Sequence, residues 1–288
     1  MSSAPSPNGQ PAEPARLAVR FWGVRGSIPT PQAEFLGVGG NTSCVEVRAP
    51  GAPVVVLDAG TGARALGHAL AWEAAEAPLD LHLFLSHFHW DHIQGLPFFA
   101  PLYGEGHRVT IYGWEAEGRI GELLSTQMRA PFFPVPFEKA GAEVRLVPFR
   151  PGDAVEVGAL TVRPFRVRHT QPAVGFRLEA GGAAAVYATD HEHGDAACDA
   201  ELQRASEGAG LLVCDAQYTP EEYEARRGWG HTTWLKATEW AREAGVGRLA
   251  LFHHDPTHDD AALARVLDEA RAHFAPSVLA TEGGEVVL

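Results

Sequence analysis

Short apolar runs that each end in a histidine or an aspartate constrain this chain more than any other feature of its sequence. Their polar ends lie near residues 87, 169, 190, 215 and 253. Runs of this length, rich in Val, Leu, Ala and Phe, are typical of buried strands. The loops that follow such strands can gather polar side chains at one rim of a sheet. The sequence therefore predicts sheets with a collection of His and Asp side chains at one edge.

Helices are expected between and after these strands. Ala- and Leu-rich or amphipathic segments predict helices over 61–77, 117–128, 232–245 and 260–275. Turns containing Gly or Pro delimit further strands, among them 16–24, 42–49, 53–60, 109–113 and 141–149. Groups of consecutive strands, with helices between and after the groups, predict two mixed sheets sandwiched between helices.

The first 16 residues differ in composition from the rest of the 288-residue chain. Pro, Ser, Gly and Ala dominate residues 1–16, which predicts a disordered tail without the apolar segment of a signal peptide. Residues 17–288 contain no repeat and no linker, and their number suits a single large domain. No apolar stretch is long enough to span a membrane. Three widely spaced cysteines, Cys44, Cys198 and Cys214, argue against a disulfide framework, so we expect a cytoplasmic protein.

The charge balance bears on the partners of this chain. The formal net charge is −13, and the lysines and arginines form no basic stripe. A protein that binds nucleic acid along many phosphates needs such a stripe, so the composition disfavours nucleic acid. A small anionic substrate is compatible with this charge, because a bound metal ion supplies a local positive field. The oligomeric state stays open, with a homodimer as the common default.

The densest group of metal-binding residue types stands in "LSHFHWDHIQG", residues 85–95. His87 and His89 are two residues apart, so in an extended segment their side chains point the same way and can share one metal. Asp91 and His92, at a turn into a helix, can face a second metal. Two metals need further ligands from later strand ends, and the candidates are His169, Asp190 and one of His253 and His254.

These motifs resemble those of the metallo-β-lactamase superfamily of hydrolases. The likeness rests on the spacing His-x-His-x-Asp-His at 87–92 and on His169, Asp190 and His253 in the order that superfamily uses. More narrowly, "VVVLDAGTGARALG", "GHTT" and "LALFHHDPTHDD" resemble the phosphodiesterase branch, which includes RNase Z and the cyclic phosphate phosphodiesterases. The implied fold class is α+β, an αββα sandwich of two mixed β-sheets flanked by helices, with the site at one edge.

The resemblance also implies a role for each site residue. His87, His89 and His169 would hold one divalent metal ion, Asp91, His92 and His253 a second, and Asp190 would bridge them. His254 is the alternative to His253. Asp215, where the RNase Z branch has Glu, would orient His231 as the acid that protonates the leaving group. Zinc is the expected metal, and manganese or iron suit the same ligands.

The function that the resemblance implies is a dinuclear metal-dependent phosphodiesterase. It would hydrolyse a small, cyclic nucleotide or sugar phosphodiester with metal-activated hydroxide, using Asp91, His231 and Asp215 as catalytic residues. Three alternatives stay open: an RNase Z-like tRNA 3′ endonuclease, an ester, lactone or thioester hydrolase on the same fold, and a binding protein that has lost catalysis.

Several other residues have interpretations that the structure can test. Asp58 in "LDAGTG" is expected to be structural, and His191 and His193 to lie in a solvated turn. Arg25 suits either a phosphate contact or a salt bridge. In the Pro- and Phe-rich loop 131–137, the aromatic rings could stack on a base, form a packed lid or contact a second subunit; they are Phe132, Phe133 and Phe137.

Overall fold

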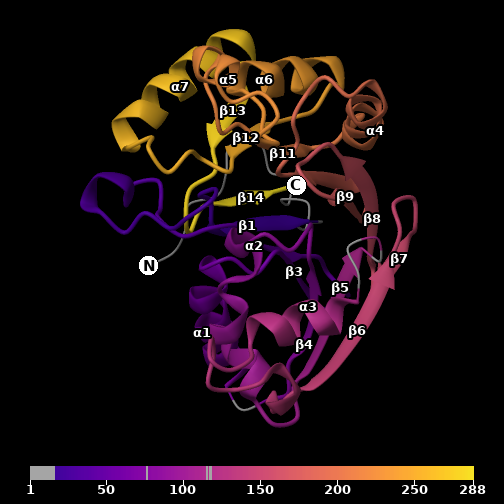
Figure 1. Cartoon of the computed structure of the whole chain (residues 1–288). Coiled ribbons are helices and arrows are strands. Elements are labelled where there is room, and N and C mark those ends of the chain that lie inside the picture. The colour runs from indigo at the N-terminus through magenta and orange to yellow at the C-terminus, as the bar shows by residue number, and fades with distance from the viewer. Residues whose placement is uncertain (1–16, 76, 115, 117–118) are drawn as a thin grey trace, which may run out of the picture.

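The computed structural model describes residues 17–75, 77–114, 116 and 119–288, and the expected tail at 1–16 lies outside these ranges. Two seven-stranded mixed sheets pack face to face, and helices cover the outer face of each (Figure 1). This architecture confirms the predicted αββα sandwich of the α+β class. None of the described helices combines the length and the apolar character needed to cross a membrane.

The first sheet carries the N-terminal strands and closes with the last strand of the chain. In spatial order its strands are β14 (Glu285–Val287), β1 (Ala18–Gly23), β2 (Cys44–Arg48), β3 (Val54–Leu57), β4 (Asp80–Phe84), β5 (Arg108–Trp114) and β6 (Glu143–Phe149). Its outer face packs against α1 (Gly62–Ala74) and α3 (Ile120–Gln127), because Leu66, Leu70 and Leu124 join one buried cluster with the strand residues. Short 3-10 turns lie in the connections of this half of the chain, at Ala33–Phe35, Leu96–Phe98, Ala100–Tyr103 and Phe137–Lys139.

The second sheet is built from the C-terminal half of the chain. In spatial order its strands are β13 (Ser277–Leu279), β12 (Leu249–Phe252), β11 (Leu211–Asp215), β10 (Ala183–Ala188), β9 (Ala173–Ala180), β8 (Leu160–Val167) and β7 (Val155–Val157). The helices α4 (Ala196–Ser206), α6 (Trp234–Glu243) and α7 (Asp260–His273) cover its outer face through Leu202, Trp240 and Val266. Two short helices, α2 (Trp90–Ile93) and α5 (Pro220–Glu224), lie in loops after strands.

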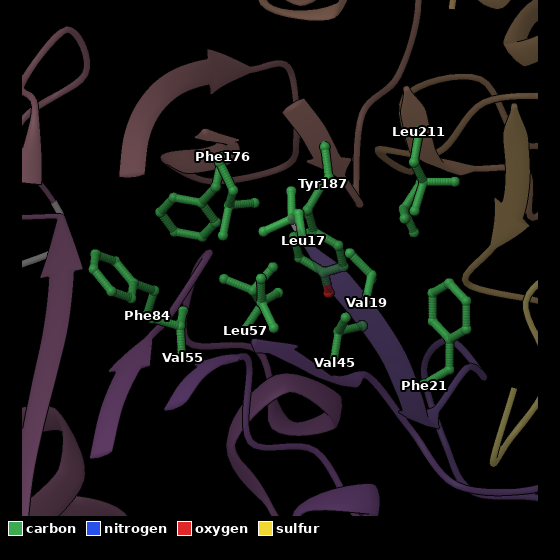
Figure 2. Close-up of a cluster of buried hydrophobic side chains, with 14 of the residues drawn as sticks. Leu17, Val19, Phe21, Val45, Val55, Leu57, Phe84, Phe176, Tyr187 and Leu211 are labelled. Carbon is green, nitrogen blue, oxygen red and sulfur yellow. The ribbon is translucent and has the colours of Figure 1, made fainter. Parts of the chain in front are cut away.

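The largest apolar core lies between the two sheets. Figure 2 shows side chains of both sheets pointing into it, with Val45, Leu57 and Phe84 from one sheet and Phe176 and Tyr187 from the other. Phe84 meets Phe176 edge to face at 5.7 Å between ring centroids, so the two sheets contact each other directly. This core fixes the two sheets against each other and thereby sets the distance between their edges.

Helix α4 was not among the predicted elements. Only Leu202 and Ser206 are buried in its sequence, so it shows little of the apolar periodicity on which helix prediction depends. Its start is instead defined by Asp195, whose side chain accepts the N–H groups of Ala197 and Cys198.

The strand directions explain why the polar strand ends meet. In the first sheet β3 and β4 are parallel, and in the second β10, β11 and β12 are parallel. Strand β8 is antiparallel to β9, which is antiparallel to β10, so β8 runs in the same direction as β10. The residues that follow these strands lie at one edge, and they include Asp58, His87, His169, Asp190 and His253.

Candidate metal centre

Seven of the predicted ligand residues form one group, here called the metal cluster: His87, His89, Asp91, His92, His169, Asp190 and His253. Ligand atoms of His87, His89, His169 and Asp190 all lie within 4.8 Å of one another, and so do those of Asp91, His92 and His253. Most of the cluster is buried, and only His89 and His169 are half-buried. The two groups correspond to the two ligand sets that the resemblance implies.

Asp190 lies between the two groups, and each of its carboxylate oxygens faces a different one. Its Oδ2 is 3.6 Å from Nε2 of His87 and 3.5 Å from Nε2 of His169. Its Oδ1 is 3.2 Å from Nε2 of His92 and 3.3 Å from Nε2 of His253. A carboxylate that bridges two cations requires this arrangement.

Hydrogen bonds on the far side of three imidazoles fix which ring nitrogen carries the proton. Nδ1 of His92 donates to Oδ2 of Asp58 at 2.8 Å, and Nδ1 of His169 donates to a backbone carbonyl at 2.9 Å. Nδ1 of His253 donates to Oε1 of Gln217 at 2.9 Å. With Nδ1 as the donor, the neutral form of each ring would turn an unprotonated Nε2 toward the centre of the cluster, as a metal-ligating imidazole does.

The cluster has more lone pairs and negative charge than its own protons satisfy. Nε2 of His87 is buried, and no described residue offers it a hydrogen bond. The Nε2 atoms of His92 and His253 face each other at 3.3 Å. Burial alone would lower the pKa of His92, but the carboxylates of Asp190 and Asp91 raise it well above its usual value. These residues fit a pair of divalent cations, and His with Asp suits zinc, manganese or iron.

Left-handed backbone conformations concentrate at the cluster. Among the described residues other than glycine, a positive φ occurs at Ser27, Asp58, Ala75, Asp190 and His253. Of these, Asp190 and His253 belong to the cluster and Asp58 bonds to it. Ser27 donates its backbone N–H to Oδ2 of Asp91 at 2.7 Å. Such conformations cost about 1–3 kcal/mol each and are typical of functional sites.

Two glycines let the backbone approach the ligand rings. A Cβ at residue 26 would lie 2.4 Å from Nδ1 of His253, and a Cβ at residue 230 would lie 2.1 Å from Nδ1 of His169. Gly230 also has a φ of +91°. A side chain at Gly26 or Gly230 would therefore displace an imidazole of the cluster.

His254, the alternative to His253, points away from the cluster. Its Nε2–H donates to the carbonyl of Ala280 at 3.0 Å, and burial lowers the pKa of His254 to about 3. The structure thus brings His253 to the other ligands and holds His254 elsewhere as a neutral, hydrogen-bonded ring.

His231 and Asp215 form a hydrogen-bonded pair beside the cluster. Nδ1 of His231 is 2.8 Å from Oδ2 of Asp215, whose other oxygen accepts the backbone N–H groups of Gln217 and Thr232. Burial alone would lower the pKa of His231, but the Asp215 carboxylate raises it to about 9. His231 is therefore protonated at neutral pH, and the shorter Asp side chain reaches it directly.

Asp58 does more than the structural role expected from the sequence. It is fully buried and accepts hydrogen bonds from the backbone N–H and Oγ of Ser86, from Nδ1 of His92 and from the Tyr187 hydroxyl. It therefore orients a ligand ring of the cluster. Its place directly after a strand is the sequence signal that could have shown this, whereas Gln217 has no such signal.

The turn at His191–His193 is not solvated, so that expectation is wrong. His191 is fully buried, accepts the N–H of Arg168 at Nδ1 and donates from Nε2 to Asp199. Glu192 is also buried, and its carboxylate accepts the backbone N–H groups of Gly228 and Gly230 at 2.7 and 3.0 Å. The turn therefore holds the loop that leads into His231.

Of the two contacts considered for Arg25, the structure shows the salt bridge, but the shorter contacts of Arg25 are with backbone carbonyls. Its side chain is fully buried and donates to the carbonyls of Gly39 and His258 at 2.7 Å each. Its nearest carboxylate, that of Asp260, is 3.8 Å away. Arg25 therefore ties the loop after β1 to the loop after β12, because its donors are used by backbone carbonyls.

The Phe-rich loop lies away from the cavity at the metal cluster. That cavity has a volume of about 710 Å³, and none of Phe132, Phe133 and Phe137 lines it. Phe137 is buried in the core under α3, and Phe133 packs against Phe98. The idea that these rings stack on a base in the active site is therefore wrong.

The fold and the metal cluster together define the class of this protein. The family profile described as the beta-lactamase superfamily domain matches residues 54–254, which is more than half of the chain. The chain belongs to the metallo-β-lactamase superfamily. The prediction of an enzyme from this hydrolase superfamily is thereby confirmed.

Individual relatives agree with the RNase Z-like, phosphodiesterase branch. The chain is 25% identical to ribonuclease Z of Haloarcula marismortui, over 93% of this chain and 95% of that protein. The metallo-beta-lactamase fold protein YhfI of Bacillus subtilis matches with a TM-score of 0.71 and 22% identity. The match covers 96% of this chain and 100% of YhfI. A diphosphatase of the PhnP family has a TM-score of 0.66 and 18% identity, covering 95% of this chain and 97% of that one.

Proposed function

We propose that this protein is a dinuclear metal-dependent phosphodiesterase that hydrolyses a small, cyclic nucleotide or sugar phosphodiester. The observation that carries the proposal is the position of Asp190, with one oxygen toward each ligand group. The two cations would be held by His87, His89 and His169 and by Asp91, His92 and His253, with Asp190 shared. When bound, they would activate water as a nucleophile and neutralise charge on the phosphoryl group.

Asp91 would orient the attacking water. Its Oδ2 accepts the N–H of Ser27 and lies 3.1 Å from Nε2 of His253. No described donor contacts its Oδ1, and Asp91 lines the cavity. Oδ1 is therefore available to accept a hydrogen bond from water, and the ordered Oδ2 holds the carboxylate in that orientation.

His231 would protonate the leaving oxygen. It lines the cavity, carries a proton at neutral pH because of Asp215, and its ring centroid is 4.9 Å from that of His253. An alkoxide leaving group is strongly basic, so a proton donor within the cavity lowers the barrier to its departure. Asp215 acts through His231 as a positioning residue.

The first test is metal analysis of the purified protein together with hydrolysis of bis(p-nitrophenyl) phosphate, with and without a chelator. We expect about two metal ions per chain and cleavage that stops on chelation and returns on addition of metal. The same preparation is assayed with lactones and acyl thioesters. Turnover of these esters without phosphodiester cleavage would replace the proposal by the carboxylic ester alternative, and a chain that binds no metal would refute it.

An RNase Z-like activity is the second candidate, favoured by the 25% identity to ribonuclease Z across nearly both chains. The charge of −13 counts against it, because tRNA binding needs a cationic surface. We therefore propose a small-molecule substrate. Tight, salt-sensitive binding of a tRNA precursor and release of its 3′ trailer would decide for the endonuclease.

A further inference from the structure

Four residues of the cavity at the metal cluster form what we call the aromatic wall: Trp90, Tyr218, Arg226 and Trp229. Trp90 and Trp229 are 73% and 60% exposed, although tryptophan is usually buried to a large extent in folded proteins. Both indoles border the cavity that leads to His89, Asp190 and His231. Exposed aromatic surface inside a cavity is typical of a site that binds a flat or apolar group.

Arg226 gives the wall a positive charge. Of the described residues that line the cavity, it alone is a lysine or an arginine. Its Cζ lies 5.1 Å from the ring centroid of Tyr218, and no described carboxylate is within ion-pair distance of its guanidinium. The neighbouring Arg227, in contrast, pairs with Glu224 at 2.7 Å. Arg226 therefore presents to the cavity a guanidinium that has no ion-pair partner among the described residues and lies over an aromatic ring.

The backbone places the wall next to the reacting groups. Trp229 stands two residues before His231, between two glycines whose N–H groups are held by Glu192. Trp90 stands between His89 and Asp91 and begins α2. A substrate whose phosphodiester reaches the metal cluster through this cavity passes the two indoles that line it.

We infer that the substrate is a nucleoside phosphodiester whose base stacks on Trp229 and Trp90 while Arg226 pairs with its phosphoryl oxygens. The inference rests on the proposed function and narrows it from nucleotides or sugar phosphates to nucleotides. A flat heteroaromatic ring beside an anion is the chemistry that indole faces and a guanidinium recognise together. A cyclic mononucleotide and the end of a single-stranded RNA both offer this combination, and the experiment separates them.

The experiment compares adenosine 2′,3′-cyclic phosphate with the same ribose cyclic phosphate lacking the base, using the metal-loaded enzyme. For Trp229→Ala we expect kcat/KM on the nucleotide to fall about tenfold or more, because stacking of one base is worth that much. The loss on the base-free substrate should be at least fivefold smaller. For Arg226→Gln we expect a rise in KM of about tenfold on both substrates, with partial recovery in Arg226→Lys.

Matched controls lie outside the cavity. Trp72→Ala removes a tryptophan that is 89% exposed on α1, and Arg227→Gln removes the neighbouring arginine. Neither substitution should change the ratio of the two kcat/KM values. Equal losses of Trp229→Ala on both substrates, or a wild-type enzyme that prefers the base-free substrate, would overturn the inference while leaving the phosphodiesterase proposal intact.

A binding measurement keeps the inference testable without turnover. Titration with AMP should quench tryptophan fluorescence in the wild type and less so in Trp229→Ala, whereas ribose 5-phosphate should leave it unchanged. If no phosphodiester is hydrolysed and AMP still quenches through Trp229, the proposed function fails and the nucleotide site stands. An absence of quenching refutes the site itself. Competition between AMP and a short single-stranded RNA then identifies the source: tighter binding of AMP supports the mononucleotide, and tighter binding of RNA the polymer.

Discussion

The metal cluster and the aromatic wall border the same cavity, but they are built in opposite ways. In the cluster, His92, Asp190 and His253 are buried, and each has partners that fix its orientation. In the wall, Trp90, Arg226 and Trp229 are half-buried or exposed, and no described residue bonds to their polar side-chain atoms. Under the proposed function, the fixed part would serve a reaction common to many substrates, and the unpaired part would select among them. The predictions below test this division.

The largest effect is expected for Asp190→Asn. Asparagine keeps the size of the side chain and tolerates the positive φ of 53°, but it removes the charge shared by both ligand groups. Hydrolysis of any phosphodiester should fall to background, and the metal content should fall from about two ions to one or fewer per chain. Circular dichroism serves as the folding control. A variant that keeps both metals and its activity would show that Asp190 is not the bridge.

His231→Gln should lower kcat by about 10²–10⁴-fold on a substrate with an alkoxide leaving group, with unchanged metal content. The loss should be much smaller on bis(p-nitrophenyl) phosphate, because p-nitrophenolate leaves without protonation. An equal loss on both substrates would assign His231 to the cluster rather than to proton transfer.

Asp58→Asn tests how much the hydrogen bond that orients a ligand ring contributes to metal affinity. The substitution weakens the acceptor that orients His92 and leaves all seven ligands in place. We expect metal affinity to fall about 10–100-fold, measured by competition with a chelator. Activity at saturating metal should recover most of its original value. An unchanged affinity would show that His92 needs no such support.

The pH profile should show an alkaline limb that belongs to His231. Its pKa is raised to about 9, so the proton is present at neutral pH and is lost as the pH rises. Bound cations disfavour the imidazolium, so kcat should begin to fall at or below about pH 9, tenfold per pH unit. Asp215→Asn should move this limb to lower pH, and a limb that stays in place would separate it from His231.

The smallest effect is expected for Glu192→Gln, which disturbs the loop joining wall and cluster. Glutamine would present an amide in place of the carboxylate that accepts the backbone N–H groups of Gly228 and Gly230. We expect the free energy of unfolding to fall by about 1–3 kcal/mol and kcat to fall severalfold, with metal content unchanged. Urea denaturation and steady-state kinetics measure both. A change in KM without a change in kcat would show that Glu192 supports substrate binding at the aromatic wall and not catalysis at the metal cluster.

Residues with a local signature were predictable from the sequence, and residues defined by contacts across the fold were not. The spacing of His87, His89 and His92 is local, and the strand ends at His169 and Asp190 follow from apolar runs. The resemblance to known hydrolases supplied their pairing. Contacts such as those of Gln217 and Glu192 depend on how the loops fold over one another, so nothing in a linear pattern marks them.

The aromatic wall shows the same limit of prediction from sequence. The sequence drew attention to Phe132 because it stands in an unusual aromatic loop, yet that loop lies elsewhere. Nothing in the sequence marks Trp90 for such a place, since its neighbours explain the motif at 87–92 without it. Helix α4 has a weak sequence signal for a related reason, because its apolar face is short and its cap is a single Asp195.

The left-handed residues around the cluster have a consequence for the lifetime of the folded chain. Four of them, Ser27, Asp58, Asp190 and His253, meet where unpaired lone pairs also converge. Without bound cations, only the hydrogen bonds of these residues and the rest of the fold offset this cost, so the first local opening should occur at these loops. Binding of metal then stabilises the native state by mass action. Resistance to proteolysis should consequently rise and fall with the supply of metal in the cell.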